Sequence, residues 1–188
     1  MLDSLVAIDH ELLFHVNGLT GNSTIDSLMM LISGKWVWIP LYAYLLYALI
    51  QNFTISSVGW IALSICALVI LTDQGSVELF KEYFQRLRPC HNLNIKDSLV
   101  LVSGKCGGQY GFVSSHAANV FGLASFVYLL MKGYSKYWVL LILWAALVSF
   151  SRVYLAVHYP ADVIAGAALG MALGVCLSVI TKKYLMIK

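Results

Sequence analysis

The chain has 188 residues, of which 60% are hydrophobic and only 11% are charged, and its formal net charge is +3. Soluble proteins average about 25% charged residues, so the composition excludes an ordinary water-soluble domain. The small positive charge comes without a basic run and gives no reason to expect a nucleic-acid partner. Several stretches reach the roughly 20 apolar residues that cross a bilayer. We therefore predict an all-α, polytopic transmembrane bundle of about five to six spans, formed by a single domain over residues 1–188.

The first predicted element is a helix over residues 2–17. Its apolar residues fall mostly on one helical face, and its polar residues Asp3, His10 and Glu11 tend to the other. This separation is typical of a helix that lies in the membrane interface rather than one that spans the bilayer. We predict that residues 1–20 form such an amphipathic interfacial helix.

The spans are predicted from the apolar stretches that follow. The first is interrupted at Ser33-Gly34-Lys35 and at Pro40, which predicts a break or kink. The second ends in a charged third, residues 78–88, that keeps helical periodicity and should protrude from the bilayer. The five predicted spans cover residues 25–51, 55–85, 114–131, 136–157 and 160–181.

The orientation follows from the lysines. In a five-span chain the short loop after the third span and the C-terminal tail share one side, and both carry lysines, which favours the cytoplasm. The long polar loop, residues 89–111, then faces outward. We predict an integral protein of the bacterial plasma (inner) membrane, with its functional face on the outer or periplasmic side. An excess of cations on that outward side opposes the rule and needs another explanation; it comprises Lys81, Arg86, Arg88, Lys96, Lys105 and Arg152.

Three segments group these cations with other reactive residues. In "SRVYLAVHYPAD", Arg152 precedes His158, and Asp162 follows four residues later, where a carboxylate can hold the imidazole if a helix restarts there. An arginine at a membrane edge can also simply snorkel, and a His-Asp pair of this spacing is often structural. Ionisable groups at the membrane are costly and usually functional, which favours the functional interpretation.

In "KEYFQRLRP", Lys81 and Arg88 are seven residues apart, which predicts that they lie two turns apart along one helical stripe. Two such cations repel unless they share an anion, and guanidinium is a preferred partner of phosphate. Neutralisation of Lys81 by Glu78 or Glu82 is the structural alternative. Pro89 is expected to end this helix.

In "GFVSSHAANV", Ser114 or Ser115 precedes a long apolar helix, and His116 follows at once. A serine there is a common helix cap, but the free N–H groups of the first turn also make an anion site. Together the three segments supply cations, hydroxyl donors and two histidines, one to attack phosphorus and one to protonate a leaving oxygen. Carboxylates are few and the cations would repel Mg²⁺, so we expect neither a metal nor another cofactor.

These residues resemble the three-part signature of the type 2 phosphatidic acid phosphatase superfamily, which reads K-x6-R-P, P-S-G-H and S-R-x5-H-x3-D. The first and third parts match at every defined position, and the resemblance spans residues 81–162. The second part differs, because Val113 and Ser115 stand in place of the family's proline and glycine. The resemblance implies that His158 is a nucleophile forming a phosphohistidine, that Asp162 orients it and that His116 protonates the leaving group. It also implies a phosphate site made by Lys81, Arg88, Ser114, Arg152 and the backbone N–H of Ser115.

Four cysteines divide into two kinds. Cys66 and Cys176 lie inside predicted spans, and the simplest interpretation is that they serve as small apolar residues. Cys90 and Cys106 lie at the two ends of the outward loop, where an oxidising compartment would let them form a disulfide. For a loop of this size the chain-entropy estimate is roughly 3 kcal/mol.

The sequence thus predicts a metal-independent membrane phosphatase that removes a terminal phosphate from a lipid. A lipid pyrophosphate such as undecaprenyl pyrophosphate, or phosphatidylglycerol phosphate, is the favoured substrate, with lipid A 1-phosphate and phosphatidate as alternatives. A non-catalytic anion-binding or transport protein would use the same cations but has no use for an oriented nucleophile. Haloperoxidase chemistry is disfavoured because membrane spans suit a lipid substrate. The sequence gives no indication of oligomeric state.

Overall fold

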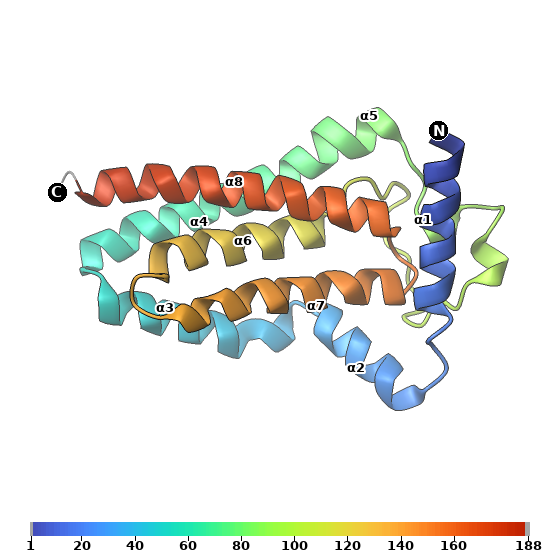
Figure 1. The fold of residues 1–188 in the computed structure, drawn as a ribbon, viewed down its shortest axis with the longest axis horizontal. Coiled ribbons are helices and arrows are strands. Elements are labelled where there is room, and N and C mark those ends of the chain that lie inside the picture. The colour runs from blue at the N-terminus through green and yellow to red at the C-terminus, as the bar shows by residue number, and fades with distance from the viewer. Residues whose placement is uncertain (1, 187–188) are drawn as a thin grey trace.

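A computed structural model describes residues 2–186, and every regular element within that range is helical. Within residues 2–186, three helices are long and apolar enough to cross a membrane, at Ile55–Phe84, Lys136–Tyr154 and Pro160–Leu185, and a bent pair adds a fourth candidate. The shorter apolar helix α6 (Ser115–Met131) lies among them (Figure 1). The predicted all-α membrane bundle is confirmed, and its five predicted apolar stretches all fall on these helices.

The first stretch contains the predicted break. Helix α2 (Ser23–Ser33) meets a 3₁₀ turn (Trp36–Trp38) and then α3 (Ile39–Asn52), and the two arms are bent by 73°. Pro40 lies in the first turn of α3, where its missing N–H costs no helical hydrogen bond.

The remaining helices run between the two ends of the bundle. Helix α4 (Ile55–Ser76) continues through a π-helical turn (Val77–Lys81) into the short α5 (Glu82–Phe84). Helix α7 (Leu140–Tyr154) follows a 3₁₀ turn at Lys136–Val139, and α8 (Pro160–Met186) closes the chain. The α6–α7 turn and the last turn of α8 lie at one end, whereas the loop after α5 and the α7–α8 turn lie at the other (Figure 1).

Helix α6 lies against α8 at very close range. Gly166, Gly170 and Gly174 of α8 recur every four residues and so lie on one face. A Cβ atom added at Gly170 would lie 2.1 Å from the backbone oxygen of Ala118 in α6. Small residues allow such backbone approach in membrane bundles. The contact fixes the start of α6 beside the start of α8, where the Ser114 N–H donates to the Asp162 carbonyl at 2.9 Å.

The prediction that Lys81 and Arg88 share one helical stripe is wrong. The helix ends at Phe84, because Gln85 takes a left-handed conformation with φ of 45°, and Arg88 is extended. Residues 86–88 instead pair with the end of the polar loop, where Leu87 forms a bridge with Tyr110. Pro89 therefore opens a 3₁₀ turn (Pro89–His91) and does not end the α5 helix.

Helix α1 (Leu2–Asn17) lies across the end of the bundle near the α7–α8 turn (Figure 1). Asp9, Leu13 and Asn17 form its buried face, one turn apart from each other, while Leu5 and Leu12 are exposed. The Asn17 side chain donates to the carbonyls of Val100 and Tyr154, at 3.0 and 2.9 Å. The exposed apolar residues fit an interfacial position, which stays a prediction.

Candidate active site

The three sequence segments converge on one cavity of about 370 Å³ at the end of the bundle. Six of the predicted site residues line it, and they come from five different parts of the fold: Lys81, Arg88, Ser115, His116, Arg152 and His158. Asp73 and Lys105, which were not predicted, line it as well. Within residues 2–186, no group of three or more His, Cys, Asp or Glu side chains could hold a metal ion. Metal independence stays a prediction.

Lys81 reaches the cavity from the π-helical turn, a type of turn that is frequent at functional sites. Its Nζ donates to the Ser115 hydroxyl at 2.6 Å, and Ser115 Oγ is 2.5 Å from Ser76 Oγ. The serine that replaces the family's glycine thus contributes its side chain, which orients the Lys81 ammonium. The resemblance implied only the backbone N–H of Ser115, whereas the structure also places the Ser115 hydroxyl against Lys81 at the cavity.

Ser114 has a different position from the one that the resemblance implied. Its side chain is fully buried, and its Oγ accepts from the Ala117 N–H at 3.5 Å as the cap of α6. Ser114 is not among the residues that line the cavity. The structure therefore joins Ser115 to the cluster and leaves the Ser114 hydroxyl behind it. Val113, in place of the family's proline, is also buried.

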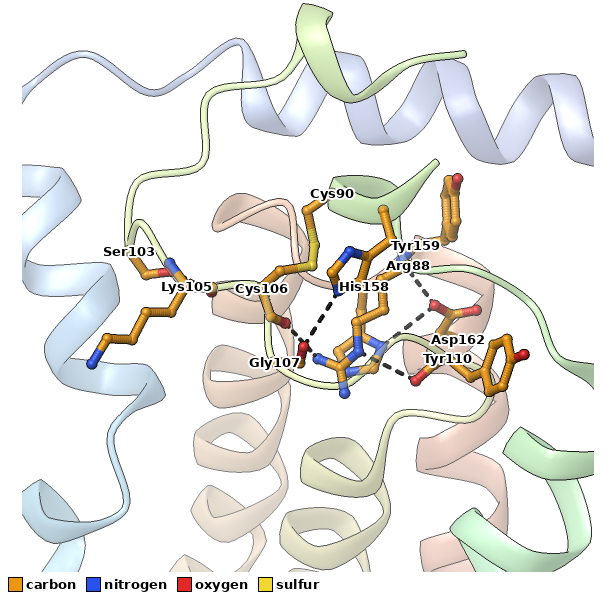
Figure 2. The surroundings of a disulfide bond; sticks show 11 residues. Arg88, Cys90, Ser103, Lys105, Cys106, Gly107, Tyr110, His158, Tyr159 and Asp162 are labelled. Carbon is orange, nitrogen blue, oxygen red and sulfur yellow. Dashed lines mark hydrogen bonds and ion pairs between the residues drawn. A yellow bond between two sulfur atoms is a disulfide. The ribbon is translucent and has the colours of Figure 1, made fainter. Parts of the chain in front are cut away.

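Arg88 is held by the end of the polar loop (Figure 2). Its Nη1 donates to the Cys106 carbonyl at 3.0 Å and its Nε donates to the Tyr110 carbonyl at 3.2 Å. Burial lowers the pKa of Arg88, although the Asp162 carboxylate opposes that effect. A Cβ atom added at Gly107 would lie 3.1 Å from Arg88 Nη1, and Gly107 has a φ of +84°. Glycine therefore lets the loop fold closely over this guanidinium.

Arg152 enters the cavity from the last turn of α7. Its Nη1 donates to the Ser33 hydroxyl of α2. Its Nε is buried, and no group within the described part of the chain accepts from it. A buried donor without an acceptor is costly, so this guanidinium is held at the cavity with only part of its hydrogen-bonding capacity used.

His158 and Asp162 lie together as the spacing predicts, because α8 restarts at Pro160. Asp162 Oδ2 is 3.4 Å from His158 Nδ1 and accepts from the Tyr159 N–H at 3.1 Å. Burial lowers the pKa of His158 to about 4, and the hydrogen bond with Asp162 only partly opposes it. The imidazole is therefore neutral near pH 7, with Nε2 free of the carboxylate. A Cβ atom at Gly111 would lie 2.9 Å from Asp162 Oδ2, so the chain passes this pair closely.

Two charged residues next to this pair were not predicted as site residues. Arg86 Nη1 donates to Asp162 Oδ1 at 2.7 Å, and its Nη2 donates to Asp9 Oδ2 at 2.5 Å. Burial opposes the charge of Arg86, but Asp162 and Asp9 raise its pKa above the ordinary value. Arg86 belongs to the outward cations that needed an explanation, and it also lies within the spacer of the first motif, two residues before Arg88. Asp9 is 77 residues away from Arg86 and carries no sequence signal.

A disulfide joins Cys90 and Cys106, whose Cα atoms are 6.0 Å apart (Figure 2). It links the residues that follow Arg88 to the loop whose Cys106 carbonyl accepts from Arg88. The bridge therefore fixes one wall of the cavity. Cys66 and Cys176 are free.

Replacing both bridged cysteines with serine should lower the free energy of unfolding by roughly 3 kcal/mol. It should also raise KM for a phosphorylated lipid several-fold, because the Cys106 carbonyl would no longer hold Arg88, while kcat should change less. Thermal unfolding and kinetics in detergent measure both effects. Serine replacement of the free Cys66 and Cys176 is the control. An unchanged KM in the double variant, or free thiols at Cys90 and Cys106 in non-reducing mass spectrometry, would contradict this role.

Comparison with known proteins identifies the family. The PAP2 superfamily model matches residues 57–185. The chain is 38% identical to a lipid A 4'-phosphatase of Bacteroides thetaiotaomicron over 90% of this chain and 75% of that protein. It is 36% identical to an undecaprenyl-diphosphatase of Sulfolobus acidocaldarius over 79% of this chain and 66% of that one.

The fold is also known from a solved structure. The PAP2-type phosphatidylglycerolphosphate phosphatase of Bacillus subtilis superposes with a TM-score of 0.69 at 20% identity, over 96% of this chain and 87% of that chain. That likeness concerns the fold, whereas the family match covers the helices that carry Lys81 to Asp162. The chain belongs to the PAP2 superfamily and is a membrane-embedded lipid phosphatase.

Proposed function

We propose that the chain removes a terminal phosphate from a membrane lipid through a phosphohistidine on His158, without a metal ion. The observation that carries the proposal is the convergence of the three predicted cations and two histidines on one cavity, with the buried Asp162 in contact with one of those histidines, His158. A site that only bound anions would need the cations but not the imidazole held by Asp162. This distinguishes the proposal from an anion-binding or transport function.

In the first step His158 Nε2 attacks phosphorus, a nitrogen–phosphorus bond forms and the bond to the lipid oxygen breaks. His116, in its protonated form beside the anionic phosphate, donates its proton to that leaving oxygen. Lys81, Arg88 and Arg152 stabilise the charge on the phosphoryl oxygens. In the second step a water molecule gives His116 a proton and attacks phosphorus, which releases inorganic phosphate and restores both histidines.

A second cavity supports a lipid as the substrate. It has a volume of about 410 Å³ and shares His116 and Asp73 with the catalytic cavity. Its other walls are mostly apolar and belong to α3, α4, α6 and α7, including Tyr42, Ile65, Val69, Leu123 and Trp144. An apolar tail could therefore remain among the helices while its phosphate lies among the cations.

For the substrate we favour the 4'-phosphate of lipid A, on the strength of the 38% identity to a lipid A 4'-phosphatase over most of both chains. An isoprenoid pyrophosphate such as undecaprenyl pyrophosphate is the second candidate, supported by the relative of that activity. We further propose that the site faces the outer or periplasmic side of a bacterial inner membrane. The disulfide at the site end of the bundle and the lysines of the α6–α7 turn at the opposite end support this orientation.

Phosphate release from a panel of purified lipids tests this function. The panel holds lipid A, undecaprenyl pyrophosphate, phosphatidylglycerol phosphate and phosphatidate in detergent, each with and without EDTA. We expect the highest kcat/KM with lipid A, loss of its 4'-phosphate by mass spectrometry, and no loss of activity in EDTA. Faster turnover of undecaprenyl pyrophosphate would transfer the assignment to that lipid. Activity that EDTA abolishes and Mg²⁺ restores on a monophosphate lipid would contradict the mechanism.

A further inference from the structure

Asp162 is fully buried, and its two carboxylate oxygens have different partners. Oδ2 faces the His158 ring and the Tyr159 N–H, while Oδ1 accepts from Arg86 Nη1 at 2.7 Å. A buried carboxylate needs a charged partner, and Arg86 is the cation in contact with it. The contact to Arg86 is also the shortest that the carboxylate makes. The plane in which Asp162 meets the imidazole is therefore determined largely by Arg86.

Arg86 itself is held on several sides. Its Nη2 donates to Asp9 Oδ2 at 2.5 Å, and its Cζ atom lies 4.0 Å from the centre of the Tyr159 ring. Its backbone carbonyl accepts from the Gly111 N–H at 2.8 Å. A planar guanidinium can contact two carboxylates and an aromatic ring at once, which an ammonium group cannot do. The side chain is therefore fixed before any substrate binds.

Asp9 connects this arrangement to α1. Its side chain is buried, and its Oδ1 accepts from the Ala161 N–H in the first turn of α8 at 2.8 Å. The neighbouring His10 stacks on Tyr159, the ring that also contacts Arg86, and the two ring centres are 5.2 Å apart. Asp9 lies outside the residues 57–185 that the family model matches. A helix outside the matched segment thus contacts the residues directly behind the proposed nucleophile.

We propose that Arg86 is a positioning residue that orients Asp162 behind His158, and that Asp9 of α1 acts through Arg86. The inference rests on the function proposed above. Arg86 and Asp9 do not line the catalytic cavity, so their loss should affect the chemical step more than lipid binding. Helix α1 accordingly contributes to catalysis and does not serve only to attach the protein to the membrane surface.

The test is a double-mutant cycle measured as kcat and KM in detergent. Arg86→Gln should lower kcat by about 10- to 100-fold, because misplacement of a reacting group costs that much, with KM changed by no more than about three-fold. Asp9→Asn should lower kcat less. The variant with both changes should be no slower than Arg86→Gln alone, because Asp9 acts through Arg86. Glu11→Gln removes a charge from the exposed part of the same helix and should leave kcat unchanged.

Folding is checked by gel filtration and thermal unfolding in detergent. If Arg86→Gln does not fold, Arg86→Lys carries the test, because a lysine keeps the charge but reaches only one carboxylate and should give an intermediate kcat. A kcat of Arg86→Gln within two-fold of the wild type, or multiplicative losses in the cycle, would overturn the positioning role and leave the proposed function intact. Absence of phosphate release from every lipid by the wild-type protein would overturn the proposed function and this role with it.

Discussion

Replacing His158 with asparagine should lower kcat by about 10⁴-fold or more, because removing the nucleophile removes the phosphoenzyme route. The variant should keep its affinity for phosphorylated lipid, since Lys81, Arg88 and Arg152 are unchanged. The neutral imidazole that burial maintains is the group lost. Phosphate release measures kcat, and mass spectrometry of the peptide that contains His158 should show phosphohistidine in the wild-type protein only.

His116 and His15 provide the comparisons. His116→Asn should also be slow with a lipid, but it should recover much of its rate with p-nitrophenyl phosphate, whose leaving group needs no proton. His158→Asn should recover nothing with that substrate. His15 is exposed on α1, and His15→Asn should have wild-type kinetics. If His116→Asn and His158→Asn recovered the same fraction of the wild-type rate with p-nitrophenyl phosphate, the proposed division of roles between the two histidines would be wrong.

The second large effect is expected in the contact between α6 and α8. Gly170→Ala would place a methyl group 2.1 Å from the Ala118 carbonyl oxygen, and backbone cannot yield as a flexible side chain can. The helices would have to separate, at a cost of about 1–3 kcal/mol or more in free energy of unfolding. Activity should also fall, because this contact aligns Ser114 with Asp162 at the site. Thermal unfolding and phosphate release in detergent measure the two losses.

Gly75→Ala in α4 is the matched control. Nothing lies within 4 Å of a Cβ atom added at Gly75, so the change should be neutral or stabilising by up to about 1 kcal/mol through helix propensity. The comparison separates overpacking from any general effect of replacing a helical glycine. Equal stability of the Gly170→Ala and Gly75→Ala proteins would refute the close-packing argument.

The helices were predictable because apolar length is a local property of a membrane chain. The break at Gly34, the restart of a helix at Pro160 and the meeting of His158 with Asp162 also follow from short-range rules, and the structure has all three. The convergence of the cations was predictable from the motif spacings, although the reason given for Lys81 and Arg88 was wrong. The position of Arg88 depends on the left-handed turn at Gln85, and no glycine or proline in the sequence indicates that turn.

The rest required contacts between distant segments. Whether Ser114 or Ser115 faces the cavity depends on how α6 is rotated against α8, and periodicity does not determine that rotation in a helix that is apolar on nearly all sides. Arg86 and Asp9 are far apart in sequence, and each alone resembles an ordinary charged residue near a membrane surface. Their pairing is visible only when α1 and the α7–α8 turn are in place.

If the site faces the periplasm as proposed above, the disulfide between Cys90 and Cys106 links completion of the site to an oxidising compartment. A newly inserted molecule with reduced thiols would already have its helices, its His-Asp pair, Lys81 and Arg152 in position. The loop that holds Arg88 would be completed only by oxidation, after the polar loop had crossed the membrane. Thiol oxidation would then be a maturation step, and full affinity for lipid phosphate would develop only in a compartment that oxidises the two cysteines.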